Sequence, residues 1–164
     1  DELWDIFKQG HQLLIEAGYQ QYETSAYAKP GFQCQHNLNY WRFGDYLAIG
    51  CGAHGKLTFP DGDILRFSKT KHPKGYLRGE YLYEEKNVEK NDRAFEFFMN
   101  RFRLLEAVPK QEFEYYTGVS QSAVKNQIDF AIQQNYIVET PDFWQITEHG
   151  KLFLNELLTL FLDE

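Results

Sequence analysis

The stretch YQQYETSAYAKPGFQCQHNLNYWRFGDYLAIGCGAHG, from Tyr19 to Gly55, decides how the rest of the chain is organised. It contains two histidines, several aromatic residues and five glycines, set between short apolar runs. Glycine occurs where a backbone needs a positive φ or must approach another group closely. Imidazoles and aromatic rings beside such a backbone indicate a functional site, although histidines and aromatics are also common in ordinary cores.

Two boxes in this stretch resemble those of a known family. The HNxxYW box lies within YETSAYAKPGFQCQHNLNYW, and the GxGAHG box lies within GDYLAIGCGAHGKL. Both closely resemble radical-SAM proteins labelled oxygen-independent coproporphyrinogen III oxidase-like, whose better-supported role is that of a heme chaperone. The match is nearly continuous over Tyr22 to Leu57, whereas residues 1–21 and 93–164 fit in layout more than in motif. The HNxxYW box favours the chaperone branch over the true oxidases.

The cysteines depart from the family's pattern. The family holds a 4Fe-4S cluster on a CxxxCxxC motif, and this chain has only Cys34 and Cys51. Two cysteines cannot supply the several thiolates that cluster ligation requires. The resemblance therefore implies the C-terminal part of a longer protein, without most of its barrel. The cluster, S-adenosylmethionine and any oxidoreductase chemistry are expected in that full-length protein only, so no catalytic residue is assigned here.

If the family's role carries over, the HNxxYW box binds heme. An imidazole can ligate heme iron, and aromatic rings can stack on a flat porphyrin. The resemblance then implies that His36 is the axial iron ligand, with Tyr40 and Trp41 beside the porphyrin. Asn37 would orient the imidazole by a hydrogen bond. The structural alternative stays open: His36 and Asn37 satisfy backbone groups in a long loop, and Trp41 packs in the core.

The GxGAHG box also has two interpretations. At the end of a strand in a complete barrel, glycines let the backbone approach a cofactor. The resemblance implies that this box lines the S-adenosylmethionine side of the tetrapyrrole cavity, through Gly50, Gly52, Ala53 and His54. The alternative is a lead-in to a hairpin that needs positive φ.

The segment before the boxes predicts a helix followed by a strand. Apolar residues recur at helical spacing over residues 2–17, which indicates an amphipathic helix, and Gly18 is placed to cap its C-terminus. Residues 19–25 read as a strand. In the family this unit ends the barrel, so the isolated strand is expected to lie as an exposed edge or to pair with another chain in a homodimer.

The segment after the boxes predicts β structure. Residues 26–35 are expected to be a loop and residues 46–49 a short strand. Residues 56–69 read as a hairpin, because the Asp-Gly pair in their middle is a strong hairpin signal. The run EEKNVEKN, over residues 84–91, reads as a charge-rich link between two domains. These domains are residues 1–90, with both boxes, and residues 91–164.

The C-terminal domain has the element order of a winged-helix module. The expected order is helix, helix, helix, hairpin, helix, with the punctuating residues Asp92 or Asn91, Gly118, Ser120 and Thr147. The complete expectation is an α+β fold: an αβ remnant of a radical-SAM barrel with a β-hairpin, followed by a winged-helix-like helical module.

A winged-helix module raises DNA binding as a rival function, and charge argues against it. The expected third helix, SQSAVKNQIDFAIQQN, has Lys125 as its one cationic residue. Residues 94–164 hold five Lys or Arg against eleven Asp or Glu, a net charge of 5 − 11 = −6. A phosphate-binding surface needs the reverse. No nucleic-acid partner is expected, and the module is interpreted as a packing or lid domain; a protein-interaction domain is the third hypothesis.

Composition bounds the remaining possibilities. Apolar residues make up 43% and aromatics 17% of the 164 residues, so a folded core is expected. No run of eighteen apolar residues appears, so no membrane span is expected. Two cysteines and the lack of a recognisable signal peptide favour a cytoplasmic protein with reduced thiols. The expected partners are a tetrapyrrole, the missing N-terminal barrel and an unidentified heme acceptor protein.

Overall fold

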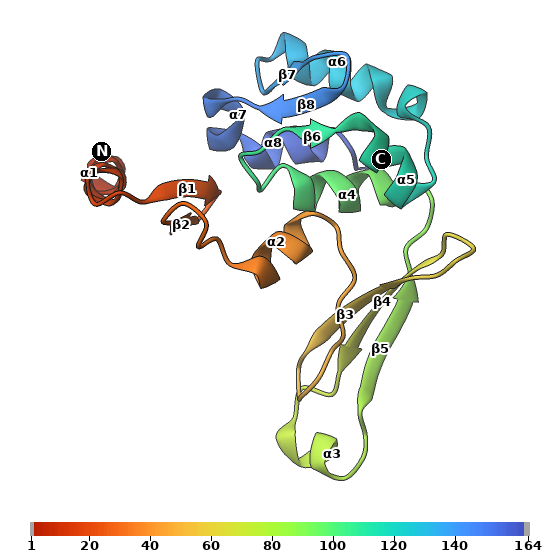
Figure 1. Ribbon diagram of the computed structural model, residues 1–164. Helices are drawn as coiled ribbons and strands as arrows, with labels where there is room; N and C mark the ends of the chain where they lie inside the picture. Colours follow the sequence, from red (N-terminus) through yellow and green to blue (C-terminus); the bar gives the residue numbers. More distant parts are fainter. Residues whose placement is uncertain (1, 163–164) are drawn as a thin grey trace.

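A computed structural model describes residues 2–162 of the chain. The protein is a mixed α+β structure with three small antiparallel sheets in its described part, as the sequence predicts at the level of fold class. Figure 1 shows three parts in space. A helix with a two-stranded sheet stands at one side, a three-stranded sheet extends away as an arm, and the C-terminal helices form a module at the base of the arm.

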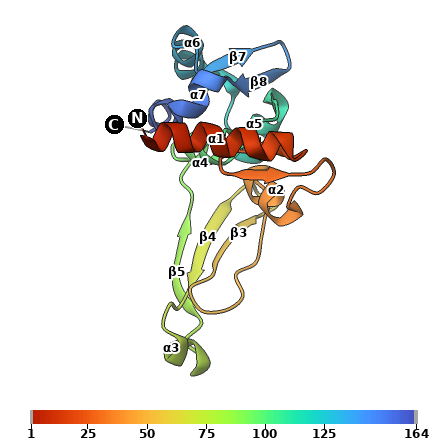
Figure 2. The same cartoon turned by 90° about the vertical axis from the view of Figure 1, so that its left-hand side faces the viewer.

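The N-terminal part begins with helix α1 (Glu2–Glu16), and Gly18 follows it in the predicted left-handed conformation, with a φ of 82°. None of its residues is buried. Figures 1 and 2 together show the helix standing beside the helical module rather than inside it. Its apolar pattern is therefore left uncovered: Leu3 is 76% exposed and Leu13 is 66% exposed.

Strand β1 (Gln20–Glu23) finds its partners inside the chain. It pairs antiparallel with β2 (Ala26–Ala28), so the expected loop over residues 26–35 is wrong at its start. At the edge of β1 that faces away from β2, the N–H of Thr24, just after the strand, donates to the Arg103 carbonyl at 2.9 Å. The expectation that β1 finds no partner within its own chain is therefore wrong, whereas the homodimer stays a prediction. A turn after β1 lets the chain fold back, and residues 103–105 of the helical module pair with the C-terminal end of β1.

Helix α2 (Gln35–Trp41) occupies the HNxxYW box. Arg42, at its C-terminus, donates to Glu106 through Nε at 2.9 Å and through Nη2 at 2.7 Å. The same carboxylate accepts from Arg101 at 2.9 Å, and Arg101 is only 1% exposed. A buried guanidinium needs charged or polar acceptors. Glu106 therefore shares the pairing of Arg101 with Glu112 and ties α2 to the helical module.

The arm is a sheet with the strand order β3-β4-β5. Its strands are β3 (His54–Thr58), β4 (Ile64–Lys69) and β5 (Leu82–Asn87), and α3 (Pro73–Leu77) lies at its far end in Figure 1. The predicted hairpin of β3 and β4 is confirmed. Gly62, in its turn, has a φ of 90°, which the left-handed region allows without strain only for glycine.

Two expectations for this region are wrong. Residues 46–49 contribute only an isolated bridge between Tyr46 and Lys56 instead of a strand. The run EEKNVEKN begins inside β5, whose residues are all exposed. Charged residues are tolerated on an exposed edge strand, where they also discourage pairing with other chains. The domain boundary near residue 90 stays a prediction.

The helical module contains the three predicted helices and the hairpin in the predicted order, but the predicted last helix is divided into two helices, and strand β6 (Val108–Pro109) was not predicted. Its elements are α4 (Arg93–Arg101), β6, α5 (Lys110–Thr117), the 3₁₀ turn η1 (Gln121–Val124), α6 (Lys125–Gln133), β7 (Ile137–Glu139), β8 (Phe143–Ile146), α7 (Glu148–Leu152) and α8 (Leu154–Thr159). The strands lie in the order β6-β8-β7. The Ser120 and Thr147 hydroxyls accept backbone hydrogen bonds as N-caps, and Gly118 ends α5 with a φ of 64°. Among residues 2–162, no helix is long and apolar enough to cross a membrane.

The core of the module is aromatic and is centred on Phe98 of α4, which is 0% exposed. Its ring stacks on Phe102 and Phe113, with centroid distances of 4.9 and 5.2 Å. Phe97 is also fully buried, because Phe43 from the segment after α2 covers that side of the helix at 5.6 Å. Helix α4 therefore has apolar contacts on two sides.

We expect Phe98→Ala to lower the free energy of unfolding by about 3–5 kcal/mol, because it leaves a cavity among the stacked rings. Denaturant unfolding followed by circular dichroism measures the loss. Phe32→Ala is the control, because that ring is 80% exposed; its loss should stay below about 0.5 kcal/mol. Equal losses in the two variants would contradict this description of the core.

The contact between α2 and the module predicts a pH dependence. Hydrogen bonds from Arg42, opposed by burial and helped by Arg101, hold the pKa of the Glu106 carboxyl below its ordinary value. Such a carboxyl stabilises the fold at neutral pH, and the contribution is lost as the pH falls from about 4.3 towards the lower folded pKa. We therefore expect Glu106→Gln to be less stable at neutral pH and to lose less stability on acidification.

Unfolding curves recorded from neutral to acidic pH test this dependence. Glu89→Gln is the control, because Glu89 is exposed and its ionisation should be little changed by folding. It should keep the acid sensitivity of the parent chain. A Glu106→Gln variant that also keeps the parent's acid sensitivity would exclude the carboxyl as its source.

Candidate functional site

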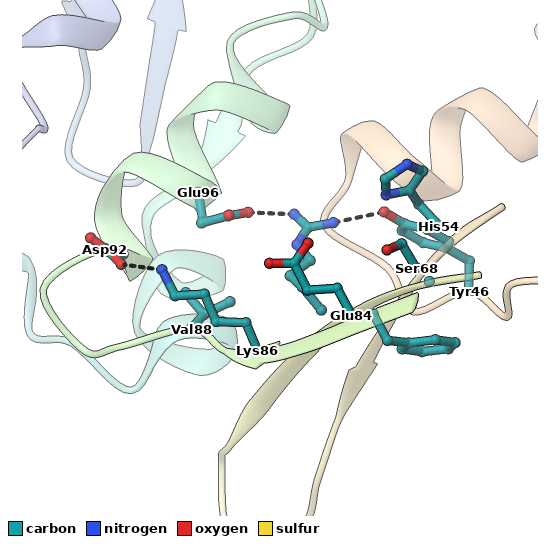
Figure 3. Close-up of a pocket in the computed structure, with 11 residues that line it drawn as sticks. Tyr46, His54, Ser68, Glu84, Lys86, Val88, Asp92 and Glu96 are labelled. Atoms are coloured by element: carbon teal, nitrogen blue, oxygen red, sulfur yellow. Dashed lines mark hydrogen bonds and ion pairs between the residues drawn. The ribbon is translucent and has the colours of Figure 1, made fainter. Parts of the chain in front are cut away.

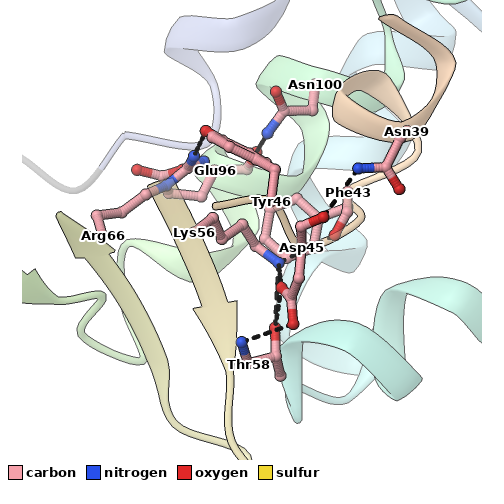
Figure 4. Close-up of polar contacts among 9 residues, drawn as sticks. All are labelled: Asn39, Phe43, Asp45, Tyr46, Lys56, Thr58, Arg66, Glu96 and Asn100. Atoms are coloured by element: carbon pink, nitrogen blue, oxygen red, sulfur yellow. Dashed lines mark hydrogen bonds and ion pairs between the residues drawn. The ribbon is translucent and has the colours of Figure 1, made fainter. Parts of the chain in front are cut away.

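The arm meets the segment after α2 around the buried ammonium group of Lys56 on β3, which is 1% exposed. Its Nζ donates to the Phe43 carbonyl at 3.0 Å, to Asp45 at 2.8 Å and to Thr58 Oγ1 at 3.1 Å. It also lies 4.2 Å from the centre of the Phe43 ring. Burial lowers the pKa of Lys56, and the hydrogen bond with Asp45 opposes this change. These contacts, drawn in Figure 4, hold the segment after α2 against the arm.

Tyr46 is fixed at both its backbone and its hydroxyl group. Its N–H and C=O form two hydrogen bonds of 3.0 Å with the backbone of Lys56. Its hydroxyl accepts a hydrogen bond at 2.7 Å from Arg66 on β4, and Arg66 also pairs with Glu96 on α4 (Figure 4). Burial raises the pKa of Tyr46 above its ordinary value, so its hydroxyl stays protonated at neutral pH. Tyr46 thus joins the arm, the segment after α2 and the helical module.

The HNxxYW box places an aromatic row along α2. His36 and Tyr40 are four residues apart, so they share one face of the helix. Their ring centroids are 4.5 Å apart and their planes meet at 89°. Tyr40 also contacts Tyr46, with 4.1 Å between the ring centroids. His36 is exposed, so its imidazole is accessible to a ligand; the box is a helix, which rules out the long loop of the structural alternative.

The other two residues of the box are less accessible. Asn37 and Trp41 are both partly buried. The Arg103 guanidinium lies over the Trp41 ring, 4.4 Å from its centroid. The Trp41 Nε1 atom is buried and finds no hydrogen-bond partner within residues 2–162. Trp41 is therefore neither an ordinary core residue nor a fully open stacking surface.

The glycines of the second box form the turn that leads into β3. Gly50 and Gly52 have φ values of 97° and 71°. Gly50 N–H donates to the Tyr76 hydroxyl at 3.0 Å, which ties this loop to α3. The Ala53 carbonyl accepts from Lys69 N–H at 2.8 Å, which extends the pairing of β3 with β4. These contacts match the interpretation of a hairpin lead-in that needs positive φ.

A cavity of about 390 Å³ lies between the arm and α4 (Figure 3). His54, the histidine of the second box, lines it together with Tyr46 and Arg66. Lys86 from β5 and Glu96 from α4 contribute charged groups to its wall. The cavity is therefore polar, with an imidazole at one side and both signs of charge at the other.

Gly55 shapes one wall of this cavity. A Cβ atom at Gly55 would lie 2.3 Å from the ring of Phe67, its cross-strand neighbour on β4. The absence of a side chain lets the Phe67 ring lie across the strand. Gly55 is needed here because there is no room for a Cβ atom, and not because the backbone has a positive φ.

Tyr46, which belongs to neither box, lies between the first box and the cavity that His54 of the second box lines. Tyr46 contacts Tyr40 of the first box, and it lines the cavity with His54 of the second. His36 and the Gly50–Ala53 segment are outside the cavity lining. The structure therefore places His54 in the same cavity as Tyr46 and leaves Gly50, beside Gly52 and Ala53, tied to α3 at the end of the arm.

Four residues of this junction escaped prediction from the sequence: Tyr46, Lys56, Arg66 and Glu96. A usable signal was present in the hairpin, because Lys56 and Arg66 face each other in its register. Two cationic side chains that are cross-strand neighbours, in a sheet that packs on another element, need hydrogen-bond acceptors or carboxylates nearby. Asp45 lies 11 positions from Lys56 and Glu96 lies 30 positions from Arg66 in the sequence, so these pairings are visible only in the folded chain.

The residues present fit heme better than an iron–sulfur cluster. Among residues 2–162, no three His, Cys, Asp or Glu side chains converge as a metal site. Cys34 and Cys51 are exposed and free. Heme iron needs only one axial imidazole from a protein, which the exposed His36 can supply. A 4Fe-4S cluster needs more thiolates than this chain contains.

Known proteins resemble the chain in both sequence and fold. Residues 88–153 match the family model of the HemN C-terminal domain. The heme chaperone HemW of Haemophilus influenzae is 88% identical over all 164 residues, and that of Escherichia coli is 69% identical over the same length. The chain spans 43% of the length of each of these relatives.

A solved structure shares the fold. The chain superposes on coproporphyrinogen III oxidase (HemN) from Escherichia coli, a radical SAM enzyme, with a TM-score of 0.67 and 14% identity. The superposition covers 96% of this chain and 40% of that enzyme. At this identity the likeness concerns the fold alone. Taken with the sequence matches, these findings show that the chain corresponds at high identity to the C-terminal region of the HemW heme chaperones and contains the HemN C-terminal domain.

Proposed function

We propose that this chain is the C-terminal part of a radical-SAM heme chaperone and that it forms one wall of a tetrapyrrole cavity. The observation that carries the proposal is the exposed His36 imidazole, set on a helix beside Tyr40 in a chain that matches heme chaperones along its whole length. An exposed imidazole with an aromatic neighbour suits the binding of a heme that must later be released. The function is then to hold heme and pass it to an acceptor protein.

In this proposal His36 is the axial ligand of the heme iron. The neutral imidazole supplies a nitrogen lone pair to the iron. Tyr40 supports the imidazole from the next turn of α2 and offers an aromatic surface beside it. Trp41 lies next to Tyr40, with 6.4 Å between the ring centroids, and Asn37 follows His36 on the helix. In this proposal Trp41 lies beside the porphyrin, and Asn37 orients the imidazole by a hydrogen bond.

The N-terminal part belongs, in this proposal, to the end of a radical-SAM barrel. The relatives are more than twice as long as the matching region, which covers 43% of each. The uncovered apolar side chains of α1, such as Leu3 and Leu13, would pack against that barrel. S-adenosylmethionine and a 4Fe-4S cluster would be bound by the longer protein. The side of the cavity that faces them would be lined by Gly50, Gly52, Ala53 and His54.

The helical module is best understood as a winged-helix-like packing or lid domain. The strand order β6-β8-β7 and the three preceding helical segments support this interpretation. Lys125, the cation of the third helix, pairs with Asp129 at 2.7 Å. Its charge is thus compensated on the same helix, which does not favour a contact with DNA phosphates.

A hemin titration followed by absorbance tests the role of His36. It is made on the 164-residue chain and on a chimera in which this chain replaces the matching region of the Escherichia coli relative. We expect saturable binding and a shifted Soret band. His36→Ala should weaken the affinity for hemin by more than about tenfold, because losing the iron ligand itself costs more than losing a residue that only orients a ligand.

His72→Ala is the matched control, because His72 is also exposed but lies at the start of α3, at the far end of the arm. It should bind hemin like the parent protein. Equal affinities and spectra for the two variants would remove His36 as the ligand. If neither the chain nor the chimera binds hemin saturably, the proposal is wrong. Binding by the chimera alone, lost in His36→Ala, would place the site between this chain and the barrel.

A further inference from the structure

The His36 ring rests on a row of contacts that leads out of α2 and into the helical module. His36 packs edge-on against Tyr40, and Tyr40 packs against Tyr46 at 4.1 Å. The Tyr46 hydroxyl accepts from Arg66 Nη1 at 2.7 Å, and the other terminal nitrogen of Arg66 pairs with Glu96. The row thus begins at an exposed imidazole and ends at a carboxylate on α4.

Helix α2 cannot hold the imidazole by itself. It has seven residues and no side-chain hydrogen bond at its N-cap, Cys34. Isolated helices of this length are unstable in water, so α2 depends on its tertiary contacts. Arg42 fixes its C-terminal end on Glu106. The face that carries His36 and Tyr40 needs a second support, and Tyr46 is the residue that contacts it.

Tyr46 is well suited to give that support, because every part of it is fixed. Two backbone hydrogen bonds to Lys56 set its position, and the hydrogen bond from Arg66 sets the direction of its ring. Glu96 fixes Arg66 in turn, and its helix is the buried centre of the module. A side chain held at its backbone and at its tip forms a rigid surface for Tyr40.

We propose that Tyr46 is a positioning residue for the His36 imidazole, and that Arg66 and Glu96 act through it. In metal sites, hydrogen-bonded outer residues usually fix the orientation of a ligating imidazole. Here aromatic packing performs this task, and the anchor lies on another part of the fold. This inference rests on the proposed role of His36 as a heme ligand.

The test compares two variants of Tyr46 in whichever protein, the chain or the chimera, binds hemin saturably. Tyr46→Leu removes the ring under Tyr40, and Tyr46→Phe keeps the ring but loses the hydrogen bond from Arg66. We expect Tyr46→Leu to weaken hemin binding by about tenfold, the lower end of the usual effect of outer-shell residues. Its ferric electron paramagnetic resonance spectrum should broaden, because the imidazole is no longer held in one orientation. Tyr46→Phe should show a smaller change of the same kind.

The control pair is Tyr115→Leu and Tyr115→Phe. Tyr115 also contacts a neighbouring tyrosine, Tyr116, at 5.0 Å, but it is 81% exposed and lies on α5. Both control variants should keep the parent's affinity and spectrum. Circular dichroism shows whether each variant is folded, and Tyr46→Phe remains a test if Tyr46→Leu is not.

The outcomes separate the two proposals. If His36→Ala abolishes the signal while both Tyr46 variants bind hemin with unchanged affinity and spectrum, the positioning role is wrong and the proposed function stands. If His36→Ala changes nothing, the proposed function fails and the positioning role fails with it. A loss of affinity in Tyr46→Leu with an unchanged spectrum would mean that Tyr46 contributes a surface and not an orientation.

Discussion

The need to satisfy the buried ammonium group of Lys56 is the constraint on which the junction depends. Burying a cation is costly unless oxygen acceptors surround it. The Phe43 carbonyl, Asp45 and Thr58 meet this need, and the Phe43 ring lies against the same nitrogen. Two of these residues come from the segment after α2, so satisfying Lys56 also fixes that segment. Tyr46 follows Asp45 directly, so the same contacts also fix the position of Tyr46.

The proposed heme site follows from this fixed segment. The exposed imidazole of His36 lies on a short helix that contributes little stability of its own. In our proposal its orientation comes from outside the helix, through the contact of Tyr46 with Tyr40 on one side and through the pairing of Arg42 with Glu106 at the end. A ligand that must bind and release heme benefits from being exposed, and a ligand that must bind in one geometry benefits from being held. The arrangement provides both.

The elements that sequence reasoning predicted correctly are those specified by local signals. Helical spacing and a following glycine predicted α1, an Asp-Gly turn predicted the hairpin of β3 and β4, and capping hydroxyls at Ser120 and Thr147 predicted the helices of the module. The predictions that failed are those for segments whose local sequence favours a structure different from the one they adopt. The charged run of β5 resembles a linker, and it becomes a strand only because β4 offers an edge.

The sequence by itself determined the family, the α+β class, the order of elements in the module and the residues of the two boxes, because each depends on residues close together in the chain. Only the tertiary structure decided that the HNxxYW box is helical, that the end of β1 pairs with the helical module and that Tyr46 joins the boxes. These features depend on partners far apart in sequence, such as Thr24 with Arg103 and Arg66 with Glu96. Such pairs leave no local period or spacing, since they form only where the fold buries a charge or an open strand edge that must be satisfied.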